Sequence, residues 1–95
     1  MRGGFQIELT ARFRRDYESL SVDIKRHVDL CIIELGQDPL PNTRRAHAVT
    51  PRGHRPTIYT VDVTANKAYK LSFHVADRTA VLRRVGTHRQ IDRSP

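Results

Sequence analysis

The sequence contains a single cysteine and no long apolar run. One cysteine cannot form an internal disulfide, and Cys31 lies in the apolar stripe of an expected helix, so we expect a small buried hydrophobe rather than a nucleophile. Residues 1–10 lack the apolar segment of a signal peptide, and no stretch approaches the roughly 18 apolar residues of a membrane span. These absences predict a cytoplasmic protein with no membrane association.

Acidic residues are scarce relative to basic ones. Lys and Arg number 17 against 10 Asp and Glu, so the formal charge is +7 with the five histidines neutral. This balance predicts association with a polyanion, nucleic acid first, or with an acidic protein. The alternative is that the excess of arginine serves solubility alone, because net charge bears on association and not on fold.

The short chain and its histidine spacing also exclude several kinds of site. A chain of 95 residues is too small for a second domain or a large buried cofactor cavity, so we expect one domain over residues 1–95, with its function on a surface or in a shallow groove. No two histidines lie four residues apart, and the single cysteine has no partner for a metal site. We therefore expect no metal and no cofactor.

Hydrophobic periodicity predicts the order of elements. Alternation at residues 5–9 is typical of a half-buried strand, and apolar residues at helical spacing predict a helical hairpin over about 11–36, with Thr10 and Ser21 as caps. Residues 37–57 hold four of the five prolines, which indicates a loop or a short irregular strand. Alternation resumes in the expected β-sheet region of about 58–85, and residues 86–95 are expected to form a short tail.

This order predicts an α+β fold, in which an N-terminal strand and the helical hairpin pack on one face of a mainly antiparallel sheet. Alternating side chains point to opposite faces of a strand. One set is expected to face the helices: Tyr59, Val61, Val63, Tyr69, Leu71, Phe73 and Val75. The other set, Asp62, Lys70, Ser72 and His74, is expected to form an exposed, basic and histidine-bearing face.

Three segments together resemble one known family. They are "RAHAV" at 45–49 after the helical hairpin, "IYTVDV" with "AYKLSF" between 58 and 73, and "VLRRVGTH" at 81–88. Over nearly the whole chain they are similar to the RelE/ParE superfamily of bacterial toxins from toxin-antitoxin pairs. The Gly-Thr-His ending resembles the histidine-rich branch of ribosome-dependent mRNA endonucleases more than the branch that poisons DNA gyrase.

The resemblance implies a type II toxin whose partners are an acidic antitoxin, the ribosome and mRNA. Members of that branch cut mRNA without metal, and the 2′-hydroxyl of the RNA attacks the neighbouring phosphate. Such attack needs a base, an acid and cations near the phosphate, and histidine suits the first two roles because its pKa is near 6.5. The resemblance assigns the catalytic pair to His88 and His47. The expected substrate-binding residues are Arg45, His54, Asp62, Lys70 and Arg84.

The chain also departs from that branch. Asp62 stands where the branch often has a histidine, and Asn66 where it has an acidic residue. Ile91 and Asp92 occupy the positions of an aromatic residue that can stack on a base.

Alternative interpretations remain. Gly86 can be simply a strand terminator with a positive φ. Three interpretations therefore remain open: an RNA-cleaving toxin, a non-catalytic ParE-like toxin that binds gyrase, and an interaction module that keeps only the fold.

Overall fold

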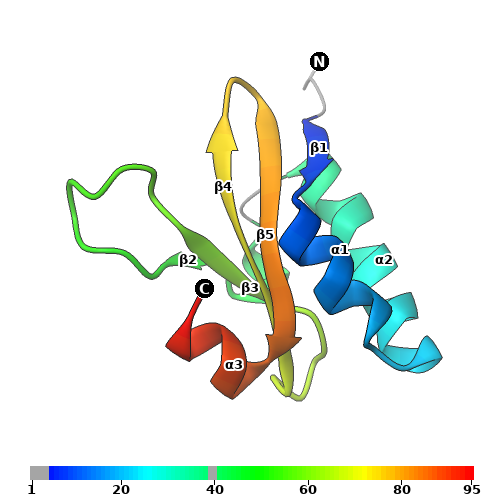
Figure 1. Ribbon diagram of the computed structural model, residues 1–95. Coiled ribbons are helices and arrows are strands. Elements are labelled where there is room, and N and C mark those ends of the chain that lie inside the picture. The colour runs from blue at the N-terminus through cyan, green and yellow to red at the C-terminus, as the bar shows by residue number, and fades with distance from the viewer. Residues whose placement is uncertain (1–4, 39–40) are drawn as a thin grey trace.

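Five strands form one sheet in the order β1-β5-β4-β3-β2, with two helices on one side and a third helix on the other (Figure 1). The computed structural model describes residues 5–38 and 41–95. Its elements are β1 (Gln6–Leu9), α1 (Ala11–Glu18), α2 (Val22–Gln37), the 3₁₀ helix η1 (Asn42–Arg44), β2 (His47–Ala48), β3 (Tyr59–Asp62), β4 (Tyr69–Ala76), β5 (Thr79–Thr87) and α3 (His88–Arg93). The predicted α+β class is confirmed.

The sheet is antiparallel except at one edge. β1 pairs with β5 in parallel, and β2, β3, β4 and β5 pair with their neighbours in antiparallel register. The β4–β5 hairpin turns at Asp77 and Arg78, whose φ angles of 49° and 61° are both positive. Two positive φ angles in succession suit a tight hairpin, because the resulting turn matches the right-handed twist of the strands.

Both expected N-caps are present. The Thr10 hydroxyl accepts from the backbone N–H of Phe13 at 3.1 Å, and the Ser21 hydroxyl accepts from Ile24 at 3.2 Å. Each cap satisfies one of the backbone donors that the first turn of a helix leaves unpaired. Thr10 also donates to the Leu82 carbonyl at 2.8 Å, so the start of α1 is tied to β5.

The core lies between the sheet and the α1–α2 hairpin. Leu71 and Phe73 are fully buried in one cluster with Cys31 and Leu35 of α2, as the alternation predicted. Burial raises the pKa of the Cys31 thiol to about 12, which leaves it a protonated, unreactive hydrophobe.

Val75 was expected to be covered by the helices, but it remains 37% exposed. It pairs with Ala80 of β5, two residues beyond Phe73, the last β4 residue that pairs with β3. Val75 therefore has a strand neighbour on one side only, which explains its exposure.

The opposite side of the sheet, which we call the polar face, corrects two predictions. It was expected to be exposed, yet Thr60, Asp62, Lys70 and Ser72 are all buried. Residues 86–95 were expected to be a tail, yet β5 continues to Thr87 and residues 88–93 form α3, which packs on β4 and β5.

A capping box, which was not among the predicted features, explains the start of α3. The Thr87 hydroxyl accepts from the N–H of Gln90 at 3.2 Å, and the Gln90 amide oxygen accepts from the N–H of Thr87 at 2.9 Å. Such a reciprocal pair satisfies two backbone donors at once. Ile91, which follows, is fully buried. Among the described residues no helix is long and apolar enough to cross a membrane.

Candidate active site

Strand register places four of the expected site residues, His47, Asp62, Lys70 and Arg84, in two rows across the polar face. In the first row His47 pairs with Thr60, Thr60 with Ser72, and Ser72 with Arg84. In the second row Asp62 pairs with Lys70, and Lys70 with Gly86. Directly opposed residues of a sheet share a face. Side chains from four strands therefore converge on one surface.

His88 is the first residue of α3 and lies at the end of the second row. Its backbone N–H donates to the Ala68 carbonyl at 2.9 Å, and its side chain is 48% exposed. Its Nε2 lies 2.6 Å from Asp92 Oδ2, and Asp92 Oδ1 lies 3.4 Å from Lys70 Nζ. The structure thus joins two expected site residues, His88 and Lys70, through a carboxylate that was not among the expected site residues.

His47 is exposed on β2 and is held by its own chain. Its Nδ1 lies 2.9 Å from the Arg45 carbonyl. A carbonyl can only accept, so this contact places the proton on Nδ1 and leaves Nε2 as the other nitrogen of the neutral ring. Arg45 has a positive φ of 54°, and its Nε lies 3.6 Å from Asp62 Oδ2. Its side chain is 67% exposed, so it can still reach an external anion.

Arg44 anchors this segment to the rest of the domain. Its guanidinium donates to both carboxylate oxygens of Glu34 at 2.7 and 2.9 Å, and to the carbonyls of Asp62 and Val63 at 3.2 and 3.0 Å. The hydrogen bond to Arg44 lowers the pKa of Glu34. The Arg44 side chain therefore links η1 to α2 and to the end of β3, and it positions the following residues Arg45 and His47.

A β-bulge brings a further arginine to the polar face. Ser72 pairs with Arg84 and Phe73 pairs with Leu82, so Arg83 is an extra residue of β5 without a partner in β4. The sequence left the orientation of these consecutive arginines open, because a regular strand would send them to opposite faces.

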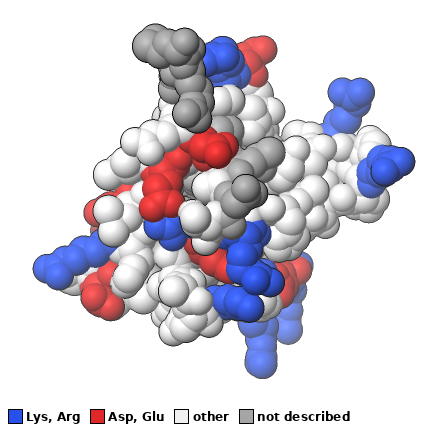
Figure 2. Space-filling model, turned by 180° about the vertical axis from the view of Figure 1, so that it is seen from behind, with Lys and Arg blue, Asp and Glu red and all other residues white. Residues whose placement is uncertain are grey.

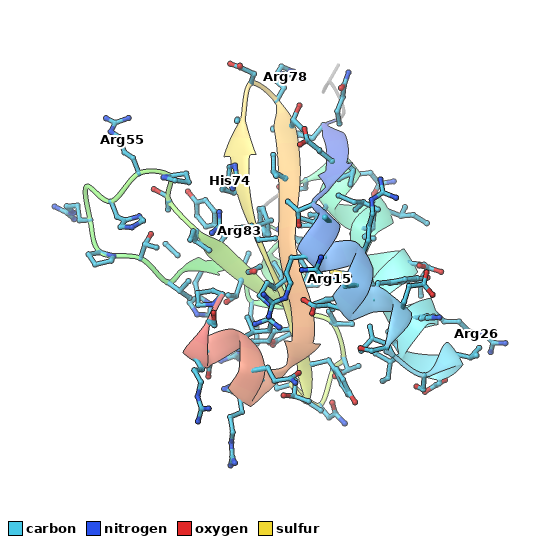
Figure 3. The ribbon with its side chains drawn as sticks, viewed as in Figure 1. Arg15, Arg26, Arg55, His74, Arg78 and Arg83 are labelled. Carbon is cyan, nitrogen blue, oxygen red and sulfur yellow. The ribbon has the colours of Figure 1, made fainter. Side chains whose placement is uncertain are left out.

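Arg83 and His74 point to the same side of the β4–β5 hairpin (Figure 3). Arg83 Nη1 donates to His74 Nδ1 at 3.4 Å. Burial, reinforced by the charge of Arg83, lowers the pKa of His74. Thr60 Oγ1, Ser72 Oγ and Arg83 Nε are buried without a hydrogen-bond partner among the described residues.

Arg84 reaches α1. Its Nε and Nη2 donate to Asp16 at 3.1 and 3.3 Å, and its Nη1 donates to the Ser94 carbonyl at 3.2 Å. Asp16 also accepts from the backbone N–H of Val85 at 3.2 Å. Asp16 therefore fixes Arg84 and the adjacent edge of β5, and nothing in the local sequence indicated this pairing across 68 residues.

His54 is not brought to the polar face. It lines a hollow of about 740 Å³ with Tyr59 and Val75, which belong to the helix-facing set of the sheet. Its Nδ1 lies 3.0 Å from the Pro56 carbonyl. Figure 3 shows Arg55, its neighbour, pointing outward from the loop.

Asn66, a departure from the family pattern, has a structural role. Asn66 Oδ1 accepts from the Thr64 hydroxyl at 2.6 Å and from the Ala68 N–H at 3.0 Å, so it stabilises the β3–β4 turn.

Gly86 does not have a positive φ, which corrects the alternative that it ends the strand in that conformation. A Cβ at Gly86 would lie 2.5 Å from Gln90 Oε1, so glycine permits the close approach of α3. In the part of the chain that is described, no three His, Cys, Asp or Glu side chains are grouped as a metal site.

No protein-family model and no curated protein matches the sequence. Solved structures do match. Among them are the archaeal RelE-RelB complex from Pyrococcus horikoshii OT3 (TM-score 0.74, 12% identity, 90% of this chain and 96% of that chain) and the isolated E. coli RelE toxin (0.67, 16%, 87% and 83%). The RelBE2 toxin-antitoxin complex from Mycobacterium tuberculosis matches with a TM-score of 0.69 and 20% identity over 88% of this chain and 98% of that chain. The chain therefore has the fold of the RelE toxins, as its sequence resemblance predicted.

Proposed function

We propose that this protein is the toxin of a type II toxin-antitoxin pair and cleaves mRNA on the ribosome by histidine acid–base chemistry without metal. One observation carries the proposal: the polar face of a RelE-type fold has an exposed histidine at each of two sides, with cations between them. His47 lies on β2 and His88 follows β5, three strands away in the sheet order. The two histidines are therefore placed to contact a substrate from different sides, and they do not bond to each other.

In this mechanism the 2′-oxygen of the RNA attacks the adjacent phosphorus, and the bond to the 5′-oxygen breaks. One histidine takes the proton of the 2′-hydroxyl, and the other gives a proton to the leaving 5′-oxygen. The RNA then ends in a cyclic 2′,3′-phosphate and a free 5′-hydroxyl. Negative charge grows on the phosphate oxygens during attack, so nearby cations lower the barrier.

The cations have different parts in this proposal. Arg45 is the principal phosphate ligand, because it is 67% exposed and its ion pair with Asp62 is long, at 3.6 Å. Asp62 orients Arg45, while Lys70 supports the site from a buried position and Arg84 from a half-buried one. His54 lies outside the two rows, so its proposed contact with RNA is restricted to nucleotides beyond the cleaved bond.

An acidic antitoxin is the proposed protein partner, and the cytoplasm is the proposed location. The net charge of +7 favours such a partner, and solved structures with this fold include RelE-RelB and RelBE2 complexes. Figure 2 shows red and blue side chains interspersed on the face seen from behind. A partner on that face has to match a mixed pattern of charge.

The test is cleavage of mRNA bound to purified ribosomes. We expect the wild-type protein to cut, and His47→Ala or His88→Ala to lower the rate by roughly 10² or more, the usual scale of one acid–base group. His27→Ala is the matched control, because His27 is exposed on α2. Circular dichroism checks that each variant is folded. Absence of cleavage by the wild-type protein, or unchanged cleavage in both folded variants, would refute the proposal.

A further inference from the structure

The imidazole of His88 has two nitrogens, and the structure distinguishes them. We infer that Asp92 is a positioning residue that holds His88 Nε2, so that Nδ1 is the nitrogen that exchanges protons with RNA. This inference rests on the proposed function, and it names the reacting atom and a residue that was not among the expected site residues. The family pattern has an aromatic residue near the position of Asp92, so a positioning carboxylate there is a feature of this chain.

The contact between the two side chains determines the tautomer. His88 and Asp92 lie four residues apart on α3 and therefore on one side of the helix, with Nε2 and Oδ2 separated by 2.6 Å. An ionised carboxylate has no proton to donate. The neutral ring must therefore carry its proton on Nε2 and a lone pair on Nδ1. No group in residues 5–38 and 41–95 forms a hydrogen bond with that Nδ1.

Asp92 is itself fixed. Its second oxygen, Oδ1, lies 3.4 Å from Lys70 Nζ, and the Lys70 side chain is only 10% exposed on β4. The helix that carries Asp92 is anchored by fully buried Ile91 and by the capping box at Thr87. The carboxylate is therefore held at both oxygens, by two different elements.

An ordinary surface ion pair lacks this second restraint. Lys25 and Glu18 lie 3.5 Å apart with side chains 27% and 77% exposed, and such pairs contribute little to stability. Asp92 and His88 are also about half exposed. The nearly buried Lys70 needs a paired carboxylate, and Asp92 provides it with Oδ1. The other oxygen, Oδ2, remains directed at His88 Nε2, where it can orient a proton carrier.

The assignment serves either role of His88. As a base, Nδ1 takes the proton of the 2′-hydroxyl, and the positive charge that forms on the ring is stabilised by Asp92 through Nε2–H. As an acid, Nδ1–H gives its proton to the leaving 5′-oxygen and the ring becomes neutral. His47 presents the opposite atom, since its Nδ1 is bound to the Arg45 carbonyl and its Nε2 is the nitrogen left for substrate.

The test is long-range ¹H–¹⁵N NMR of the His88 ring at a pH where the ring is neutral, together with ribosome-dependent cleavage. In the wild-type protein we expect a protonated, pyrrole-type Nε2 and an unprotonated, pyridine-type Nδ1. Asp92→Ala should give a mixture of tautomers and lower kcat about tenfold, less than loss of the histidine itself, with little change in KM. Asp92→Glu should restore the wild-type tautomer in part. Asp23→Ala, at an exposed aspartate of α2, is the control and should change neither readout.

The spectrum is independent of activity. A wild-type His88 with its proton on Nδ1, or the same tautomer in the wild-type protein and Asp92→Ala, would overturn the inference. An unchanged kcat in Asp92→Ala would overturn it as well. Absence of cleavage by the wild-type protein would refute the proposed function, while the spectrum would still decide whether Asp92 sets the tautomer.

Discussion

Both faces of the sheet contain buried residues at their centre, but the sequence pattern predicts burial on only one of them. On the helix-facing side Leu71 and Phe73 are fully covered by an apolar core. On the polar face Thr60 and Ser72 are equally inaccessible, although their hydroxyls have no hydrogen-bond partner among the described residues. Alternation predicts which residues share a face. Whether solvent reaches that face depends on what packs over it, and here α3 packs on β4 and β5.

Two neighbours in β4 allow a direct comparison of the faces. Phe73→Ala should lower the free energy of unfolding by about 3–5 kcal/mol, because it removes a fully buried ring and leaves a cavity. Ser72→Ala should change it by less than about 1 kcal/mol, since its buried hydroxyl loses no partner. Urea denaturation of both variants measures the difference. A loss from Ser72→Ala as large as that from Phe73→Ala would mean that the hydroxyl is bonded.

Asp16 tests how far the polar face depends on α1. Asp16→Asn should lower the free energy of unfolding by about 1–3 kcal/mol, because Arg84 and the Val85 N–H lose their anionic acceptor. The side chains of Asp16 and Arg84 are at most 16% exposed, so water replaces that acceptor poorly. Asp29→Asn is the control and should cost little, since the hydrogen bond that Asp29 accepts from Tyr17 is exposed. Equal urea midpoints for the two variants would show that the Asp16–Arg84 pair contributes no more to stability than the exposed hydrogen bond of Asp29.

Gly86 tests the packing of α3. Gly86→Ala places a Cβ 2.5 Å from Gln90 Oε1, so the capping box has to open. We expect a loss of about 0.5–2 kcal/mol, the range for a lost N-cap, and faster hydrogen exchange in α3. The same change combined with Gln90→Ala should cost less than the sum of the single changes, because the clash and the capping box share one side chain. Additive losses would mean that Gly86→Ala does not destabilise the protein through the Gln90 side chain.

The sequence predicted the elements but not the contacts that hold the site residues, because the signals of the elements are local. Caps at Thr10 and Ser21 and alternation over 69–75 depend on nearby residues, and the structure has both caps and that strand. The Arg84–Asp16 pair spans 68 residues and the Lys70–Asp92 contact spans 22, and no local pattern encodes either. The Thr87–Gln90 capping box, by contrast, is encoded locally in "THRQ", so the start of α3 was predictable from the sequence.

His74 offers the smallest and most specific test of the polar face. Its pKa is lowered by burial and by the charge of Arg83, so the unfolded chain binds the proton more readily than the folded one. The contribution of a neutral His74 is fully present above its ordinary pKa of about 6.5 and is lost as the pH falls through the folded value. His74→Gln should therefore flatten the decline of unfolding free energy below pH 6.5, which urea titrations between about pH 7.5 and 5 measure. A decline as steep in the variant as in the wild-type protein would show that the ring is solvated at this position, and that the contact with Arg83 leaves its protonation unchanged.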